Sequence, residues 1–467
     1  MAIELNQNDQ NMIKTLTLFF ILIHCSIAYG QQNLNSAKNN ALAGNGVSFS
    51  RGIETLHINP ANLSFFDRKT WEISFLPILA IDFQNNVFNY ETYKKYFTGD
   101  GNGNPKYLSA LDKNDILSQF DGTNPGRVIS STSFDILNIA INYKEISGGF
   151  GFSIRERIFS QMNIAKDAFK LLLFGNTLNE KYNFSDFKGS GYWVREYGIG
   201  YGFQFIKSGK ARAAFGINLK YLTGQAMFSM NDTEADFITT DTSLNGRIKL
   251  RALYSYSDFF KEGNNYKVFE NSGQGQSFDV GFSYIPNELV SLGISLIDFG
   301  YMIWKKNLFE INLDTSGIIK NISDENEYKP FEDLIENHKS QISKKKINLP
   351  YTLHAGITIN LDKSEYFQDI NSFPIALCFE YSSTVNTEYF LSESINQYGI
   401  SLSLLPVKWL PLRAGYSFGY MPSRLTIGTG LNFTNFDIDI SFGNISALFL
   451  ANSAKSFSFS FSSKILF

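Results

Sequence analysis

The chain has 467 residues, of which 43% are hydrophobic and only 18% are charged, below the usual quarter for soluble domains. Its 41 lysine and arginine residues against 44 acidic residues give a net charge of -3, which excludes a dedicated nucleic-acid binder with a basic stripe. The 44 phenylalanines and 24 tyrosines exclude a disordered tail, and the mean hydropathy of -0.13 is too low for a bundle of membrane helices. A large β-rich protein remains.

Residues 1–30 are predicted to be a secretory signal peptide. Lys14 precedes the apolar run 16–23, and Ala28 and Gly30 are the small residues that a signal peptidase reads. The run is much shorter than the roughly 20 residues of a spanning helix, so cleavage near Gly30 is predicted, with Met12 as an alternative start. Cleavage leaves Cys378 as the single cysteine, so no intramolecular disulfide is expected. An exported chain without disulfides fits the Gram-negative envelope.

Alternation of apolar and polar residues recurs from residue 70 to the C-terminus. In 455–467, for example, Phe457, Phe459 and Phe461 share one face and serines share the other. The segments have about 10 residues, the length of a tilted membrane strand, whereas strands of soluble sandwiches have about 5–6. The pattern therefore predicts an all-β protein, a transmembrane antiparallel β-barrel of about 14 strands over 70–467. The strands are expected to start near residues 70, 133, 147, 190, 210, 272, 289, 346, 373, 395, 410, 424, 435 and 455.

The lengths of the connections predict the orientation of the barrel. With the mature N-terminus in the periplasm, the long connections 84–132, 159–189, 225–271 and 305–345 all fall outside the cell, as expected for outer-membrane barrels. The alternating segment 246–256 would break this parity, so it is placed as a β extension within the third outer loop. The C-terminal Phe467 resembles the signal read by the outer-membrane assembly machinery. That machinery and the outer-membrane lipid, including lipopolysaccharide, are the expected partners.

Residues 31–69 do not alternate and carry two motifs, Ala-Gly-x-Gly at 43–46 and Asn-Pro-Ala-x-Leu at 59–63. Together, directly before the first strand, they resemble the N-terminal hatch of the FadL superfamily of long-chain fatty-acid and hydrocarbon channels. That superfamily also includes the Bacteroidota PorV-type proteins of type IX secretion. The resemblance implies a hatch over 31–69 inside the barrel, with Gly44, Gly46, Asn59, Pro60 and Ala61 in its packed turns. A simple β-turn before a strand is the alternative interpretation, because Asn-Pro favours turn initiation.

No catalytic site, metal site or cofactor is predicted. The histidines lack His-x-x-x-His spacing. A Ser–His–carboxylate set around His354 stays open, although a polar lumen residue is the preferred interpretation. Asp100 begins a run that imitates a calcium loop, but Pro105 and Leu111 stand where the pattern needs Gly and Glu. The glycines at 198, 200 and 202 lie in a strand and open no helix, so they are interpreted as clearance for the hatch and not as a nucleotide loop.

The outer loops hold the predicted ligand site. Residues 164–174 form an apolar helical pattern unsuited to full exposure, so Phe169, Leu172, Leu173 and Phe174 are expected to line a hydrophobic groove. Packing of this helix against other loops is the alternative. Strand phase points several charged residues into the lumen, where they tune a pore or hydrogen-bond the hatch: Lys220, Asp279, Glu380, Arg413, Arg424, Asp437 and Asp439.

These observations predict an outer-membrane protein of a Gram-negative cell that binds or passively transports small hydrophobic molecules, without catalysis. Capture in the outer groove would be followed by release through a gap controlled by the hatch. The alternative is a non-transporting envelope protein, such as a PorV-like handler of secreted protein cargo. No nucleic-acid partner is expected.

Overall fold

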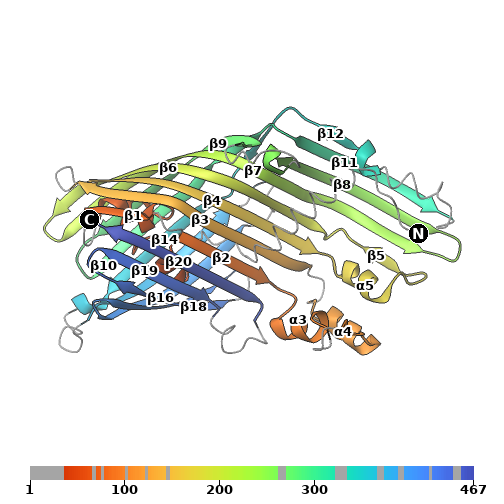
Figure 1. Ribbon diagram of the computed structural model, residues 1–467, viewed down its shortest axis with the longest axis horizontal. Helices are drawn as coiled ribbons and strands as arrows, with labels where there is room; N and C mark the ends of the chain where they lie inside the picture. Colours follow the sequence, from red (N-terminus) through yellow and green to blue (C-terminus); the bar gives the residue numbers. More distant parts are fainter. Residues whose placement is uncertain are drawn as a thin grey trace.

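A computed structural model describes residues 36–65, 70–74, 78–99, 104–120, 125–143, 148–260, 270–320, 334–364, 373–385, 387, 394–419, 423–444 and 454–467. One antiparallel sheet closes into a barrel with 14 strand positions (Figure 1). Two short strands, β1 (Trp71–Ser74) and β2 (Ile78–Asn85), share the first position, because both pair with β3 (Gly126–Tyr143) and with β20 (Ser456–Leu466). The first and last strands thus close the ring, which confirms the predicted fold class.

The other positions follow the chain order. They are β4 (Gly148–Ile164), β6 (Lys188–Ser208), β7 (Ala211–Thr239), β9 (Gly273–Ile285), β10 (Val290–Trp304), β13 and β14 (Lys345–Asn348 and Tyr351–Asn360), β15 (Ile375–Val385), β16 (Ile395–Val407), β17 (Leu410–Phe418), β18 (Arg424–Asn432) and β19 (Phe436–Gly443). Most begin within three residues of the predicted starts. Strand β3 begins earlier than the predicted residue 133, because its serine- and threonine-rich first part pairs with β4 without showing apolar alternation.

The connections are unequal in length, and this distinguishes the two ends of the barrel. The turn end carries short connections, such as the turn at Gly209, and holds both Thr70 and the C-terminal Phe467, whose backbone groups bond to each other. The loop end carries the helices α3 (Tyr90–Phe97), α4 (Ala110–Ser118) and α5 (Lys166–Phe174). Figure 1 shows the C-terminus at one end of the strands and these helices beyond the other.

The loop end also carries strands outside the ring. Strand β7 has 29 residues, and its second half pairs with β8 (Leu244–Tyr256) instead of β9. Strand β8 then pairs with β11 (Leu308–Ile319), which pairs with β12 (Lys339–Gln341), and β5 (Lys181–Asn183) pairs with β7. The segment 246–256 therefore forms an extension of the sheet and no position of the ring, as predicted.

The two faces of the barrel wall are inverted relative to a soluble protein. Large apolar side chains stand exposed on the outer face around the ring: Phe134, Phe150, Ile199, Leu219, Phe282, Ile294, Leu353, Phe379, Ile400, Leu412, Leu425 and Phe457. The alternate positions are buried and mostly polar, such as Ser153, Asn218 and Ser460. A closed sheet with an apolar outer band and a polar interior is the fold of an outer-membrane β-barrel.

Local sequence explains the helices of the loop end. Asn89 caps α3 by accepting a hydrogen bond from Thr92 N, and Ser109 forms a capping box with Asp112 at the start of α4. The remaining short elements are η4 (Asp258–Phe260), α7 (Leu334–Asn337) and, at the turn end, η5 (Leu361–Lys363). Within the described residues, the structure contains no helix with the length and hydropathy needed to span a bilayer.

A bulge in β10 changes which residues face the interior. Before it, Ser295 and Ile297 are buried; after it, Asp298, Met302 and Trp304 are buried, so the inward phase shifts by one residue. Asp298 itself has a φ of 65°, which is unusual for a residue other than glycine. Without this bulge Trp304 would face the outside of the barrel.

Candidate functional site

The N-terminal segment, residues 36–65, lies inside the barrel near the turn end. It contains α2 (Ala37–Ala41), η1 (Gly52–Thr55) and η2 (Pro60–Ser64). Its polar groups bond to strands on all sides of the ring, with donor–acceptor distances of 2.5 to 3.1 Å: Asn40 to Ser460 on β20, Asn45 to Ser401 on β16, Ser48 to Thr358 on β14, Ile58 to Ser295 on β10, Leu56 to Asn218 on β7 and Ser64 to Asn142 on β3. The predicted hatch is thus a segment that forms hydrogen bonds with strands on all sides of the ring. That this segment opens stays a prediction.

A single carboxylate holds the Ala-Gly-x-Gly motif. Glu380 Oε2 accepts hydrogen bonds from the backbone N–H groups of Gly46 (2.7 Å) and Val47 (3.0 Å). Its other oxygen lies 2.8 Å from His354 Nδ1. Gly44, with a φ of 86°, turns the chain in the left-handed region just before this contact. The predicted lumen residues Glu380 and His354 therefore serve as an anchor for the segment.

The Asn-Pro-Ala motif is both a turn and a packed contact. Asn59 caps η2 through Ala61 N (3.1 Å), while its Nδ2 donates to Val47 O (2.7 Å) and to Ser283 Oγ of β9 (2.9 Å). Pro60 occupies the first helical position, where its missing N–H costs nothing. The simple-turn interpretation describes the local geometry but omits these contacts with the wall.

Glycines of the wall make room for this motif. A Cβ on Gly202 would lie 2.5 Å from Pro60 O, and one on Gly200 would lie 3.0 Å from Leu63 Cδ1. A Cβ on Gly216 or Gly281 would collide with Ala61 or Asn59. The strand glycines at 200 and 202 are therefore clearance for the N-terminal segment, as predicted. The prediction is wrong for Gly198, because the atoms nearest to a Cβ there belong to Ser153 and Asn218 of the wall.

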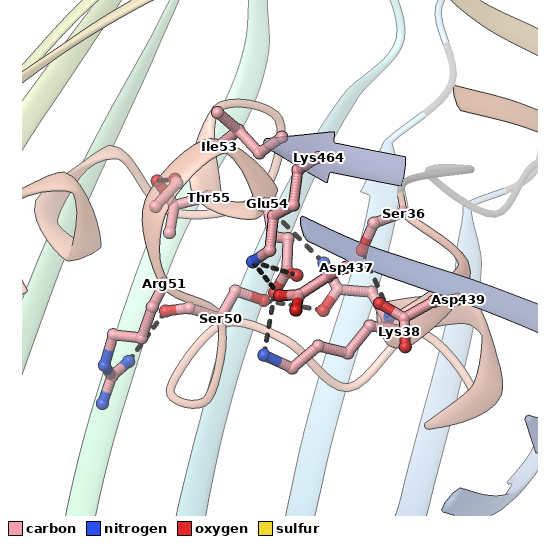
Figure 2. Close-up of polar contacts among 12 residues, drawn as sticks. Ser36, Lys38, Ser50, Arg51, Ile53, Glu54, Thr55, Asp437, Asp439 and Lys464 are labelled. Atoms are coloured by element: carbon pink, nitrogen blue, oxygen red, sulfur yellow. Dashed lines mark hydrogen bonds and ion pairs between the residues drawn. The ribbon is translucent and has the colours of Figure 1, made fainter. Parts of the chain in front are cut away.

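An ion cluster ties the segment to the wall at the turn end (Figure 2). Glu54 lies between Lys38 (2.9 Å) and Lys464 of β20 (3.0 Å), and Lys464 also lies 3.7 Å from Glu72 and 3.8 Å from Asp437. Burial alone would raise the pKa of Glu54, but the two lysines outweigh it and lower this pKa to about 2. A cavity of about 370 Å³ adjoins the cluster, with Phe49 and Arg413 in its lining.

A buried ionic layer lies next along the barrel. Arg157 of β4 contacts Glu196 of β6 (2.6 Å) and Asp298 of β10 (2.7 Å), and Lys220 of β7 contacts Asp298 (2.5 Å) and Asp279 of β9 (2.8 Å). Beside it, Arg155 lies 3.4 Å from Asp135, and His57 of the N-terminal segment lies 3.7 Å from the same carboxyl group. Each charge has a close opposite charge, as a buried ion requires.

An apolar cluster lies on the loop-end side of the ionic layer, with most members on strands of the ring and Leu253 and Leu308 on β8 and β11 outside it. Its buried members are Ile129, Phe159, Tyr192, Val194, Leu222, Met227, Leu253, Met302, Trp304, Leu308, Ile347 and Leu349. The order of layers repeats along the strands. In β7, Gly216 contacts the N-terminal segment, Lys220 belongs to the ionic layer and Leu222 to the cluster; in β10 the same order is Gly293, Asp298 and Met302. The interior therefore changes from polar to ionic to apolar toward the loop end.

This apolar cluster is the candidate ligand site. Barrel interiors are normally polar, so a dozen buried apolar residues at one end of the interior form a place where a hydrophobic molecule gains from leaving water. Met227 and Met302 have unbranched, flexible side chains that repack around a guest more readily than β-branched residues. The ionic layer below the cluster separates it from the N-terminal segment.

Comparison with known proteins gives one sequence match to a family. Residues 60–441 match the model of a family of unknown function, DUF5723. The chain belongs to the DUF5723 family. No curated protein matches the sequence.

Solved structures resemble this DUF5723 chain over most of its length. A Pseudomonas aeruginosa FadL homologue has 12% identity, covers 94% of this chain and 99% of its own, and has a TM-score of 0.48. A TodX deltaS2S3 mutant monoaromatic hydrocarbon channel has 12% identity, coverages of 92% and 97%, and a TM-score of 0.46. The Ralstonia pickettii toluene transporter TbuX has 10% identity, coverages of 93% and 98%, and a TM-score of 0.41.

The helix predicted to line an outer groove is α5, and the structure separates its four residues. Phe169 packs against Phe88 and Phe120, with ring centroids 5.3 and 5.2 Å away. Leu172 is 78% exposed and Phe174 38%, with Lys113 above the Phe174 ring, while Leu173 is half-buried. None of the four belongs to the apolar cluster of the interior. Packing on other loops, the alternative interpretation, describes Phe169.

The seven charged residues predicted to face the lumen are all buried: Lys220, Asp279, Glu380, Arg413, Arg424, Asp437 and Asp439. Arg413 of β17 pairs with Asp439 of β19 (2.5 Å). Arg424 of β18 pairs with Asp82 of β2, and Asp437 of β19 lies near Lys464 of β20. Strand phase gives the face of a residue, whereas its partner depends on the curvature of the closed wall.

Sequence reasoning missed most of the ionic layer and the apolar cluster. Tyr192 and Val194 share the inward phase with Glu196 and the glycines of β6, so continuing that phase toward residue 188 would have found them. The β10 bulge hid Asp298 and Trp304, because alternation alone does not reveal a one-residue insertion. Within the described residues, no group of three or more potential ligands is placed to hold a metal ion. The calcium-like run begins at residues 100–103, which lie outside the described residues.

Proposed function

We propose that this barrel binds small hydrophobic molecules in the apolar cluster at its loop end and passes them into the envelope. The observation that carries the proposal is the cluster itself, which is larger than the two apolar clusters formed around the N-terminal segment and lies beyond the ionic layer. The exposed apolar band on the outer face supports an outer-membrane location with the loop end outward.

Passage beyond the cluster requires rearrangement under this proposal. The ionic layer and the N-terminal segment both lie between the cluster and the turn end, and both are held by buried polar contacts. Movement of a ligand past them would break several charge-assisted bonds together. The cluster is therefore the binding site, and release is the step that the N-terminal segment controls.

Tryptophan fluorescence tests binding at the cluster. Replacement of Trp71, Trp193 and Trp409 by phenylalanine leaves Trp304 as the single tryptophan. We expect bromodecane to quench its fluorescence saturably in detergent, and Met302→Asp in this background to abolish the quenching. Leu172→Asp is the matched control, since it places the same charge on the exposed face of α5. Absence of saturable quenching in the folded single-tryptophan protein would contradict the proposal.

A second function is favoured by the sheet outside the ring. Strands β7, β8 and β11 continue beyond the closed barrel, and residues such as Ile318 are exposed there. A protruding sheet suits contact with another protein, as in a PorV-like handler of secreted cargo. Capture of secreted proteins by the intact barrel, lost when 244–256 and 308–319 are shortened together, would support this role.

A further inference from the structure

We propose that the apolar cluster selects a neutral hydrophobic molecule with one hydrogen-bond acceptor, a ketone, ester or ether oxygen, which accepts from Trp304 Nε1. This inference rests on the proposed function of the cluster. Trp304 is 1% exposed, and none of the described residues accepts a hydrogen bond from its indole N–H. Buried tryptophans normally pair this group, because an unpaired buried donor is costly.

Two glycines of the wall lie against the carbon atoms of the Trp304 indole. Trp304 lies beside paired glycines of the neighbouring strands, Gly273 of β9 and Gly224 of β7. A Cβ on either glycine would lie closest to carbons of the six-membered ring of the indole, Cε3 and Cδ2 for Gly273 and Cη2 and Cζ3 for Gly224. The glycines thus face the six-membered ring of the indole, and the atoms nearest to them are carbons and not Nε1.

The other polar group of the cluster lies against the ionic layer. Tyr192 is the second member of the cluster with a hydrogen-bonding side chain, and its hydroxyl accepts from Arg157 of that layer (3.2 Å). Of these two groups, the Trp304 indole N–H is the one for which the described residues hold no acceptor. A single donor among apolar side chains fixes the orientation of a ligand with one acceptor.

The charges below the cluster favour a neutral ligand over a carboxylate. Arg157 and Lys220 each contact two carboxylates. The layer contains the cations Arg155, Arg157 and Lys220 against the carboxylates Asp135, Glu196, Asp279 and Asp298, one more formal negative charge than positive. A carboxylate head group entering the cluster would meet this excess without a free cation.

Two probes that differ only in a carbonyl group test the inference. Menthone and p-menthane have the same carbon skeleton, and only menthone accepts a hydrogen bond. We expect Trp304→Phe to weaken equilibrium binding of menthone about fivefold and to leave p-menthane within about twofold, the effect of losing one ordinary hydrogen bond. Trp193→Phe is the matched control, because Trp193 Nε1 donates to Glu156 outside the cluster (2.8 Å).

A spectroscopic readout keeps the test independent of packing changes in the variant. The carbonyl stretch of bound menthone should lie at lower frequency in the unmodified protein and in Trp193→Phe than in Trp304→Phe, because a hydrogen bond weakens the C=O bond. Binding of both probes with equal sensitivity to Trp304→Phe and no frequency shift would overturn the inference and leave the proposed function standing. Failure of both probes to bind the unmodified protein would overturn both.

Discussion

The wall and the N-terminal segment approach so closely that a single added Cβ atom on a wall glycine would collide with the segment. A Cβ on Gly281 of β9 would collide with Asn59 Oδ1, the atom that caps η2, and would also lie 3.0 Å from Pro60 Cδ. Because Asn59 also bonds to Ser283 and Val47, it cannot move without losing those bonds. Glycine at 281 is therefore required by close approach, although its backbone is ordinary strand.

Gly281→Ala is expected to displace the Asn59–Pro60 turn and lower the free energy of unfolding by about 1–3 kcal/mol, the usual cost of overpacking. Limited proteolysis should then cut residues 36–65 faster than in the unmodified protein. Gly246→Ala is the matched control, because its Cβ would lie 3.5 Å from Phe237 Cβ, an ordinary contact. Equal protease resistance of the two variants would show that the segment does not depend on this contact.

At this same scale, the sequence predicts the face of a residue better than its partner. Glu380 and Lys220 were placed in the lumen by phase, yet their partners, the Gly46 N–H and Asp298, come from distant parts of the chain. Asp298 lies at a bulge, where the alternation on which the prediction depends is broken. For this reason alternation does not place Trp304 in the interior, although a tryptophan at the end of a strand is visible in the sequence.

Among the elements, the apolar helix α5 has some residues that pack against another loop and others that stay exposed. Phe169 joins Phe88 and Phe120, whose ring centroids lie 5.8 Å apart, in one aromatic contact between the loop-end segments. Leu172, one turn along the helix, has little to contact. The sequence predicted the helix from its composition, but the choice of packed face depends on the helices of another loop, which the chain order does not reveal.

Phe169→Ala should therefore loosen the contact of α5 with the first loop, at a cost of about 1–3 kcal/mol because the ring is only half-buried. Leu172→Ala should change stability by less than about 0.5 kcal/mol, as for surface positions in general. Hydrogen exchange of α4 and α5 measures the difference. Faster exchange in Leu172→Ala than in Phe169→Ala would contradict this account of the helix.

The strands differ from the helices in how far sequence predicts them. Alternation identified every position of the ring, because each strand has one face toward the apolar exterior and one toward the polar interior. It did not reveal that β7 continues for 29 residues, since its second half alternates less clearly and pairs with β8. A change of partner along one strand leaves no periodic signal.

In the molecule as a whole, closure of the ring depends on polar contacts that bind the N-terminal segment to both early and late strands. The Glu54 cluster is the clearest case, since Lys464 lies on the last strand, Glu72 on the first, and Glu54 and Lys38 on the segment. The cluster therefore ties together parts of the chain that are separated by almost its full length. Its charge state should control the stability of the entire fold.

Acidification is expected to destabilise the barrel in two stages. Burial, together with nearby Arg155 and Lys220, holds the pKa of His57 well below 6.5, so stability falls once the pH drops below 6.5, where the unfolded chain binds the proton first. The pKa of Glu54 is lowered from 4.5 to about 2, so its contribution is fully present above pH 4.5 and is lost as the pH falls toward 2. That second loss corresponds to about 3 kcal/mol.

Urea unfolding in detergent at a series of pH values separates these stages. Glu54→Gln should be less stable than the unmodified protein at neutral pH and should lose the decline between pH 4.5 and 2, because glutamine carries no charge to neutralise. Glu288→Gln supplies the control, since Glu288 forms an exposed pair with Lys210 (3.5 Å) that contributes little. A Glu54→Gln profile parallel to that of the unmodified protein would mean that the strand ladder alone closes the ring, and that the segment occupies the interior without stabilising it.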